Sequence, residues 1–250
     1  MYAEMAQFYD ELTTDVPYTA MAEYIETLFL KYGGKKPSLL LELACGTGSM
    51  TREMAKKGYD MIAVDYSSDM LTLAREKLDD IAPQPLLLCQ RMEELNLYGT
   101  VDGVISCLDS VNYLSSQKAL EQAFERVGLF LEEGGLFIFD LHTEYKLSRL
   151  AKETYVRETE NVLCLWQTEW NEANRLARFD LDFFVREQDE RYRRFSETHI
   201  ERAHTLEEID QALSKGGMTR LSALGEKKLR FQKETDDRIY IVAQKTETKG

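Results

Sequence analysis

The sequence has little proline, few cysteines and no long apolar run. Proline occurs 4 times and glycine 14 times in 250 residues, which excludes collagen-like and low-complexity chains. Apolar runs stay well below the roughly 20 residues that a membrane-spanning helix needs. The 4 cysteines are widely spaced without a C-x-x-C pair, namely Cys45, Cys89, Cys107 and Cys164. We therefore expect buried thiols in a reducing compartment, with no disulfide framework and no metal site.

Basic residues are also in the minority. The 31 lysines and arginines are outnumbered by 44 aspartates and glutamates, so the formal net charge is −13. This imbalance argues against a protein that holds nucleic acid by general attraction to phosphate. Near the start, Glu4 and Asp10 stand where a secretory signal would have lysine or arginine. We expect a cytoplasmic protein that binds neither nucleic acid nor a membrane.

Between residues 38 and 149, short apolar runs alternate with amphipathic stretches. This alternation is typical of a parallel sheet covered by helices on both faces. Five runs are predicted as strands: Leu39 to Leu43, Met61 to Asp65, Leu86 to Cys89, Val101 to Ser106 and Leu136 to Leu141. A helix is predicted before the last strand, with apolar residues at helical spacing up to Leu131 and with Gly134-Gly135 as its end.

The pattern changes on both sides of this core, within what we interpret as one domain. Residues 1–37 are predicted to form an aromatic-rich helical cap. Residues 150–204 are interpreted as an inserted antiparallel sheet that covers a pocket. Its predicted strands are Val162 to Trp170, Ala177 to Arg186 and Tyr192 to Glu201, with turns near Asn171-Glu172 and Gln188-Asp189. Residues 205–246 return to the core, with a helix from Thr205 through Lys215 and the strands Thr219 to Leu224 and Arg238 to Gln244.

The most informative segment runs from Leu39 to Ser49, where a predicted strand enters a glycine-rich turn. Small residues there let backbone amides approach a ligand closely, and the N-terminus of the following helix favours an anionic group. The dinucleotide fingerprint G-x-G-x-x-G is incomplete, because Thr51 stands where a third glycine would follow Gly46 and Gly48. A P-loop is excluded because no G-K-[ST] follows.

Two acidic residues narrow the choice of ligand. Glu42, near the strand end, would sit badly beside a pyrophosphate but suits a ligand that carries an ammonium and a sulfonium. Asp65 ends the second strand, where an acid can accept hydrogen bonds from both ribose hydroxyls. The two residues predict adenosine attached to a cationic tail, and therefore favour S-adenosylmethionine over NAD.

The segments E-L-A-C-G-T-G (Glu42 to Gly48) and A-V-D-Y-S (Ala63 to Ser67) resemble class I S-adenosylmethionine-dependent methyltransferases. The resemblance covers roughly Tyr2 to Leu141 and resumes from His204 to the last strands. Within that family, Y-D-E-L (Tyr9 to Leu12) and D-S-V-N-Y-L (Asp109 to Leu114) are most similar to small bacterial enzymes. The resemblance implies a doubly wound α/β fold, with a mostly parallel seven-stranded, Rossmann-like sheet whose last two strands form an antiparallel hairpin.

The same resemblance implies a set of cofactor-binding residues. The methionine end would be held by Glu42, Ala44, Gly46 and Gly48, the ribose by Asp65, and the adenine by Tyr66, Met70 and Met92. The pocket below the sulfonium would be lined by Cys107, Leu108 and Asp109 and closed by Tyr9 and Tyr18. Two positions depart from the family pattern, because Ala44 replaces the first glycine and Arg91 stands where relatives usually have an aspartate.

The expected function is methyl transfer from S-adenosylmethionine to a nitrogen or oxygen atom of a small molecule. Alignment supplies most of the rate in such a displacement, so a catalytic base is not required. If one exists, the candidates are His142, Asp109 and His204. Two alternatives use the same fold, namely an RNA or tRNA base methyltransferase and a non-catalytic cofactor-binding regulatory module. A basic strip beside the pocket would favour RNA, whereas a closed aromatic or acidic pocket would favour a small molecule.

Overall fold

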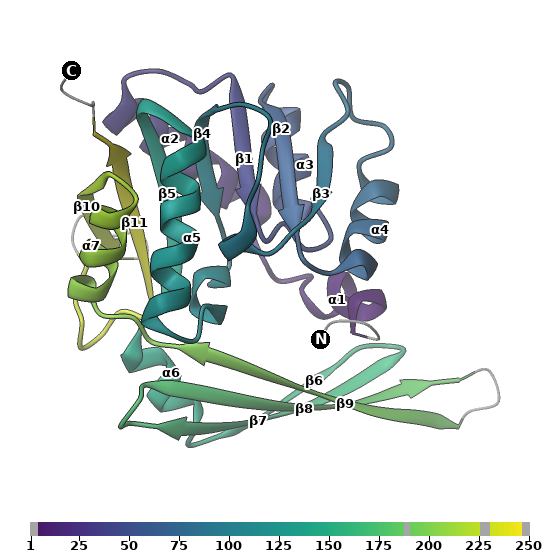
Figure 1. The fold of residues 1–250 in the computed structure, drawn as a ribbon. Coiled ribbons are helices and arrows are strands. Elements are labelled where there is room, and N and C mark those ends of the chain that lie inside the picture. Colours follow the sequence, from purple (N-terminus) through teal and green to yellow (C-terminus); the bar gives the residue numbers. More distant parts are fainter. Residues whose placement is uncertain (1–4, 188–190, 226–230, 247–250) are drawn as a thin grey trace.

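The computed structural model describes residues 5–187, 191–225 and 231–246. It contains a seven-stranded sheet with the strand order β10-β11-β5-β4-β1-β2-β3 (Figure 1). In chain order the strands are β1 (Leu39–Leu43), β2 (Asp60–Asp65), β3 (Leu86–Cys89), β4 (Val101–Ser106), β5 (Leu131–His142), β10 (Met218–Gly225) and β11 (Arg238–Lys245). Strands β1 to β5 pair in parallel, whereas β11 is antiparallel to both β5 and β10. The predicted doubly wound sheet with a terminal antiparallel pair is therefore confirmed.

Helices cover both faces of this sheet because its strands carry apolar side chains on both sides. One face, with Leu40, Ile105 and Ile138, packs against α2 (Tyr18–Gly33) and α3 (Ser49–Lys56), and α4 (Ser68–Lys77) lies next to α3. The other face, with Leu41 and Phe137, packs against α5 (Gln117–Phe130) and α7 (Leu206–Lys215). None of the helices among the described residues is long and apolar enough to cross a membrane.

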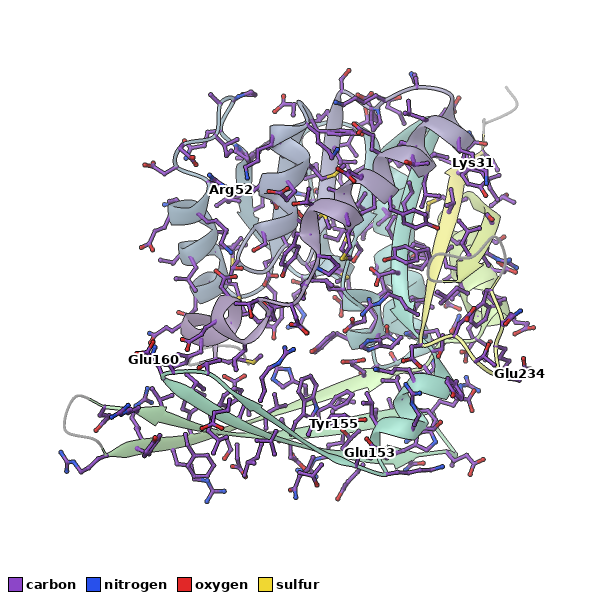
Figure 2. All side chains as sticks on the ribbon, turned by 180° about the vertical axis from the view of Figure 1, so that it is seen from behind. Lys31, Arg52, Glu153, Tyr155, Glu160 and Glu234 are labelled. Carbon is purple, nitrogen blue, oxygen red and sulfur yellow. The ribbon has the colours of Figure 1, made fainter. Side chains whose placement is uncertain are left out.

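A second sheet lies across the carboxyl ends of the parallel strands (Figure 1). It is an antiparallel meander of β6 (Thr154–Glu158), β7 (Val162–Asn171), β8 (Leu176–Arg186) and β9 (Tyr192–Arg202), in that order. One face packs Phe179, Leu181 and Phe183 against α1 (Ala6–Leu12) and α6 (Glu144–Leu150). Both ribbon views place α1 beside this sheet (Figure 1, Figure 2).

The structure differs from the predicted elements at β6 and at the end of α5, and one predicted turn is not tested. Strand β6 was not predicted, because all five of its residues are exposed and show no apolar alternation. The predicted turn at Gln188-Asp189 lies outside the described residues. The helix before β5 ends at Phe130, not at Gly134-Gly135, because Leu131 already pairs with Val101 of β4.

Three features explain the local course of the chain. Gly135 lies within β5, where an added Cβ would come 2.9 Å from the Asp102 carbonyl oxygen, so the strand needs a glycine there. The predicted N-terminal helical cap is two helices. Pro17 lacks the backbone N–H that a continuous helix would need there, and α2 begins at the next residue. Thr205 and Glu208 form a capping box at the start of α7.

Candidate active site

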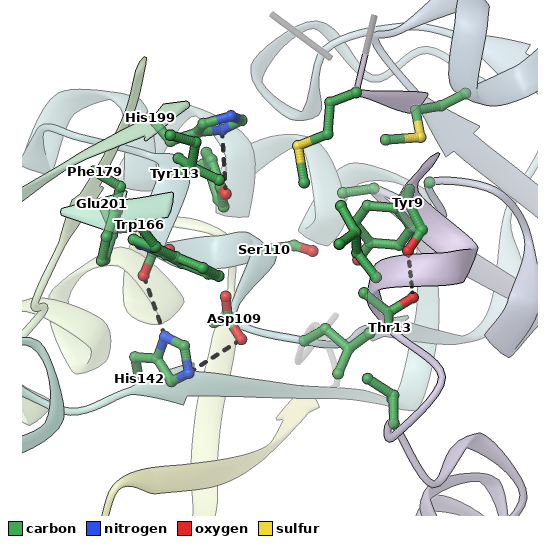
Figure 3. Close-up of a pocket in the computed structure, with 18 of the residues that line it drawn as sticks. Tyr9, Thr13, Asp109, Ser110, Tyr113, His142, Trp166, Phe179, His199 and Glu201 are labelled. Carbon is green, nitrogen blue, oxygen red and sulfur yellow. Dashed lines mark hydrogen bonds and ion pairs between the residues drawn. The ribbon is translucent and has the colours of Figure 1, made fainter. Parts of the chain in front are cut away.

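A cavity of about 700 Å³ lies between the carboxyl ends of the parallel strands and the inner face of the second sheet. The loop after β1 and the end of β2 line it through Ala44, Gly46 and Asp65. The segment after β4, the end of β5 and strands β6 to β9 complete the wall, and α1 closes one side through Tyr9 (Figure 3). The volume falls in the range of pockets that enclose small organic molecules.

The loop after β1 is shaped by residues in the left-handed backbone region. Ala44, Gly46 and Gly48 have φ angles of 55°, 54° and 77°. A Cβ added at Gly46 would meet no atom within 4 Å, and Gly46 lines the cavity, so a side chain there would fill ligand space. A Cβ at Gly48 would instead come within 3.2 Å of Ala74 and Leu78. Gly46 therefore leaves room for a ligand, whereas Gly48 permits close packing on α4.

Asp65 ties the end of β2 to the glycine loop. Its Oδ2 accepts a hydrogen bond from the Gly46 backbone N at 2.9 Å, and its Oδ1 accepts one from the Ser67 backbone N at 2.8 Å. Burial raises the pKa of this carboxyl group, although these backbone donors oppose the shift. Because Asp65 also lines the cavity, its remaining lone pairs can accept hydrogen bonds from a ligand.

Glu42 lies behind the loop and does not line the cavity. Its side chain is buried and accepts a hydrogen bond from the Thr51 hydroxyl, the residue at the position of the missing third glycine. Burial raises its pKa to about 8. A cationic ligand in front of the loop would favour the ionised form of this carboxyl group.

Nine of the predicted cofactor residues line the cavity: Tyr9, Ala44, Gly46, Asp65, Tyr66, Met70, Met92, Leu108 and Asp109. The other four, Tyr18, Glu42, Gly48 and Cys107, do not. Tyr18 lies at a neighbouring hollow together with Ser49 and Lys77, and Cys107 is buried in the core beneath α2 and α3. Thus the glycine loop and the segment after β4 converge on one cavity, and four predicted residues lie outside its lining.

Arg91, which departs from the family pattern, also lines the cavity. Its guanidinium carbon lies 5.5 Å from the centroid of the Tyr66 ring, within the range of a cation–π contact. In place of an acidic side chain, this part of the wall therefore carries a cation that packs on Tyr66.

Helix α1 is fastened to the glycine loop by a polar network that sequence reasoning missed. Lys77 Nζ on α4 donates to Asp10 Oδ1 at 2.7 Å, to Thr47 Oγ1 at 2.8 Å and to Ser49 Oγ at 2.6 Å. Thr47 Oγ1 also donates to Asp10 Oδ1 at 2.7 Å. Because Asp10 follows Tyr9 in α1, this network holds Tyr9 against the cavity.

The chain after β4 is strained where it meets the cavity. Leu108 and Asp109 have φ angles of 57° and 55°, and neither residue is a glycine. Each such residue costs on the order of 1–3 kcal/mol, and such strain concentrates at functional sites. The turn directs the Asp109 side chain toward His142 at the end of β5 (Figure 3).

His142 is flanked by two carboxylates. Its Nε2 lies 3.4 Å from Asp109 Oδ1, and its Nδ1 lies 3.3 Å from Glu201 Oε2 on β9 (Figure 3). Burial opposes the charged imidazolium, but Asp109 and Glu201 outweigh it and raise the pKa of His142 to about 9. Burial also opposes ionisation of Asp109, but His142 and Arg238 outweigh it and lower the pKa of this carboxyl group.

Arg238 completes this cluster from β11. Its Nη2 lies 2.7 Å from Asp109 Oδ1 and 3.0 Å from His142 Nε2, and its Nη1 pairs with Asp140. Asp109, His142 and Glu201 are residue types that can ligate a metal, and their ligand atoms lie within 4.8 Å of one another. A guanidinium already occupies the space beside two of them, so this geometry suits an ion-pair network better than a metal site.

The third candidate base, His204, lies outside the cavity. Burial, with a smaller contribution from Arg202, lowers its pKa to about 4. Of the three residues suggested by sequence, the structure therefore brings only Asp109 and His142 together at the cavity.

The second sheet contributes cavity residues that the sequence motifs do not reveal. Trp166 and Phe179 form an edge-to-face pair with ring centroids 5.7 Å apart, and Tyr113 after β4 lies opposite His199 on β9 (Figure 3). Alternation along each strand was the available signal, since every second residue of β7 and β8 faces inward. The same alternation places Glu169 and Asp182 on the opposite face, away from the cavity.

Asn112 joins the two sheets. Its Nδ2 donates to the carbonyl oxygens of His142 at 3.0 Å and of Arg202 at 2.9 Å, and its Oδ1 accepts from the His142 backbone N at 3.0 Å. The residue is fully buried. A single amide thus connects the segment after β4, the end of β5 and the end of β9.

Comparison with known proteins identifies relatives of this chain. Residues 40–135 match the family described as a methyltransferase domain. YqeM of Bacillus subtilis (strain 168), whose name describes it as a candidate methyltransferase, is 30% identical over 251 residues, which covers 99% of this chain and 98% of YqeM. A dTDP-3-amino-3,4,6-trideoxy-alpha-D-glucopyranose N,N-dimethyltransferase of Streptomyces venezuelae is 27% identical over 183 residues, 72% of this chain and 75% of that protein.

A solved structure shares nearly the whole fold. The crystal structure of an S-adenosylmethionine-dependent methyltransferase from Clostridium acetobutylicum superposes with a TM-score of 0.86 at 31% identity, and covers 98% of this chain and 99% of that one. The glycine loop, the acid at the end of β2 and the cavity between them fit this cofactor. The chain belongs to the S-adenosylmethionine-dependent methyltransferases.

Proposed function

We propose that this methyltransferase acts on a nitrogen or oxygen atom of a small molecule, which binds between the glycine loop and the second sheet. The observation that carries the proposal is the cavity itself. Its walls come from α1, from the carboxyl ends of the parallel strands and from the inner face of the second sheet, so an acceptor is enclosed on several sides.

On the cofactor side, we propose that Ala44 and Gly46 approach the methionine end, with Glu42 supplying negative charge from behind the loop. Asp65 would accept the ribose hydroxyls, and Tyr66, Met70 and Met92 would contact the adenine, as their places in the cavity wall allow. The bound cofactor supplies an electrophilic methyl group. Tyr9, held by the network of Asp10 and Lys77, would exclude water from that end of the cavity.

On the acceptor side, we propose that the second sheet acts as a lid. Trp166, Phe179 and Phe183 provide an apolar wall, while Asp109, Tyr113 and Glu201 provide polar groups that can orient an acceptor. A reaction of this kind gains most of its rate from the alignment of nucleophile and methyl group. A wall of fixed aromatic rings on a sheet serves that purpose, because their positions are determined by strand packing.

A small acceptor is favoured over an RNA base for two reasons. Aromatic side chains in the cavity wall support a small acceptor, and the net charge of −13 opposes binding to a polyanion. Similarity to the amino-sugar N,N-dimethyltransferase supports a nitrogen acceptor in particular.

The test is transfer of a labelled methyl group. The protein is incubated with methyl-labelled S-adenosylmethionine and, in separate reactions, with the small-molecule filtrate of a bacterial extract and with purified total RNA. We expect label in the filtrate and none in RNA. Label in RNA alone would contradict the proposal, and label in neither would favour a regulatory cofactor-binding protein.

A further inference from the structure

His199 stands at the cavity on the inner face of β9 and is 3% exposed. Its Nδ1 lies 3.5 Å from the Tyr113 hydroxyl, and the two rings meet edge to face with centroids 6.0 Å apart (Figure 3). Tyr113 comes from the short helix η2 (Ser110–Tyr113) that follows the strained turn after β4. A phenolic hydroxyl and an imidazole therefore face each other beside the acceptor space.

The other ring nitrogen of His199 faces a carboxylate. Its Nε2 lies 3.4 Å from Glu197 Oε2, an ion-pair contact and not a hydrogen bond, and these residues share one face of β9 because they are two positions apart. Glu197 is itself positioned, since its Oε1 accepts a hydrogen bond from the Met5 backbone N at 3.1 Å. The negative charge of Glu197 beside Nε2 favours the proton on that nitrogen and leaves the Nδ1 lone pair toward Tyr113.

The neighbouring His142 is not suited to accept a proton. Its Nδ1 faces Glu201, and its Nε2 lies 3.4 Å from Asp109 Oδ1 and 3.0 Å from the Arg238 guanidinium, which can only donate. Both ring nitrogens are therefore engaged by charged neighbours. The cavity thus contains one histidine whose two nitrogens have charged partners and a second whose Nδ1 faces a hydroxyl group.

We propose that Tyr113 and His199 form the proton-accepting pair for methyl transfer, with Glu197 as the residue that positions His199. This inference rests on the proposed function, since it assumes an acceptor with an N–H or O–H group in the cavity. The acceptor donates its proton to the Tyr113 oxygen as the Tyr113 proton passes to His199 Nδ1. The acceptor's freed electron pair forms the bond to the methyl carbon, and the electrons of the broken C–S bond stay on sulfur. His199 then releases its proton to water.

The arrangement is tested first without an acceptor. Nitrogen-15 NMR of the histidine side chains in the protein loaded with S-adenosylhomocysteine reports which nitrogen of neutral His199 carries the proton. We expect the proton on Nε2, and a shift of the Nδ1 resonance in Tyr113→Phe. A proton on Nδ1 would overturn the proposal, because that nitrogen could not then accept from Tyr113.

The second test uses rates of label transfer to the small-molecule filtrate. General-base catalysis contributes typically 10²–10⁴-fold. Tyr113→Phe and His199→Gln should therefore each lower kcat by about 100-fold or more, with little change in KM for S-adenosylmethionine. The double variant should be no slower than either single variant, because the two groups act as one unit. Multiplicative losses in the double variant would overturn the pairing.

Thr198→Ala is the matched control, since Thr198 lies between Glu197 and His199 but bonds Asp180 on the outer face of the sheet. It should transfer label at the wild-type rate. The split between kcat and KM separates catalysis from packing, because loss of the proton acceptor lowers kcat while KM for S-adenosylmethionine stays near the wild-type value.

Failure of the proposed function is distinguishable from failure of this inference. If the wild-type protein transfers no label to the filtrate, the proposed function fails. If it transfers label and both single variants keep the wild-type rate, the proton-accepting pair is wrong while the proposed function stands.

Discussion

Single backbone positions decide whether the loop after β1 can hold a cofactor. Gly46→Val should abolish binding of S-adenosylmethionine, because the added side chain points into the cavity. Valine in the left-handed backbone conformation of Gly46 should also lower the free energy of unfolding by about 1–2 kcal/mol. Titration calorimetry measures the binding, and thermal unfolding measures the strain.

Gly34 offers a control for the strain alone. It has a φ angle of 69° at the end of α2, and an added Cβ would meet nothing within 4 Å. Gly34→Val should therefore lose a similar amount of stability and keep its affinity for the cofactor. If Gly46→Val still binds S-adenosylmethionine, the cofactor does not contact this loop at Gly46.

Asp65 is predicted to carry much of the ribose recognition. Charge-assisted hydrogen bonds contribute about 1.5–3 kcal/mol each, so Asp65→Ala should weaken cofactor binding by roughly 10-fold to 100-fold or more. Asp60→Ala, at the exposed opposite end of β2, is the control and should bind normally. Equal affinities in a folded Asp65→Ala protein would place the ribose elsewhere.

The buried carboxyl group of Glu42 makes stability depend on pH. Its pKa of about 8 in the folded protein lies above the value of about 4.3 for an exposed glutamate. The folded state therefore binds the Glu42 proton more tightly than the unfolded state does. The stability that this proton contributes is complete below the unfolded-state pKa, and it is lost as the pH rises through the folded-state pKa. Denaturant unfolding without cofactor at about pH 5 and about pH 8 should show this loss in the wild type.

Glu42→Gln should lose less stability over the same interval, since an amide does not titrate. The difference between the two proteins isolates Glu42 from His142, whose raised pKa acts in the same direction. If wild type and variant lose stability in parallel, Glu42 does not titrate in this range.

At the scale of elements, the agreement with sequence follows the apolar pattern. Strands β1, β3 and β4 have the predicted bounds, because each is a short apolar run ended by polar or small residues. Strand β6 has no such pattern, and it forms because its backbone pairs with β7, as in Tyr155 with Trp166. Pairing with a neighbour is information that no local window of the sequence contains.

The residues of the candidate site also fall into those that local sequence predicts and those that only the fold brings together. Gly46, Asp65 and Tyr66 could be predicted because they lie at or just after the ends of two consecutive strands, β1 and β2, at a spacing that carries the chemistry. The pair of Tyr113 and His199 could not, since these residues lie 86 positions apart and meet only when the second sheet covers the core. Lys77 and Asp10, 67 positions apart, escaped prediction for the same reason.

The hydrogen bonds that hold α1 against the glycine loop give a prediction at this scale. Lys77→Met removes the cation that Asp10, Thr47 and Ser49 share, so α1 should open more often. Hydrogen exchange of residues 6–12 should accelerate, and cofactor affinity should fall, while the rest of the exchange pattern stays unchanged. Lys56→Met, which removes only the exposed pair with Glu53, should alter neither. Unchanged exchange in Lys77→Met would mean that apolar packing alone holds the helix.

At the scale of the whole molecule, Asn112 is the joint between the two sheets. Asn112→Ala leaves buried carbonyl and amide groups of His142 and Arg202 without this partner, at about 1–3 kcal/mol for each unsatisfied group. The unfolding temperature and the methyl-transfer rate should both fall, while affinity for S-adenosylmethionine stays within about tenfold, a change of about 1.4 kcal/mol. Asn96→Ala, at an exposed position, is the control. A large loss of cofactor affinity would show that the joint also shapes the cofactor site.

The strand register at the edge of the cavity has a consequence for how the protein folds. His142 on β5 pairs with Arg238 on β11, and 96 positions of chain separate them. Closing so long a loop is entropically costly and slow. The meander of β6 to β9 pairs only strands that are neighbours in sequence, so it can form early and shorten the effective loop. We therefore expect the His142–Arg238 contact to form late in folding, together with the part of the cavity wall that carries the charged cluster.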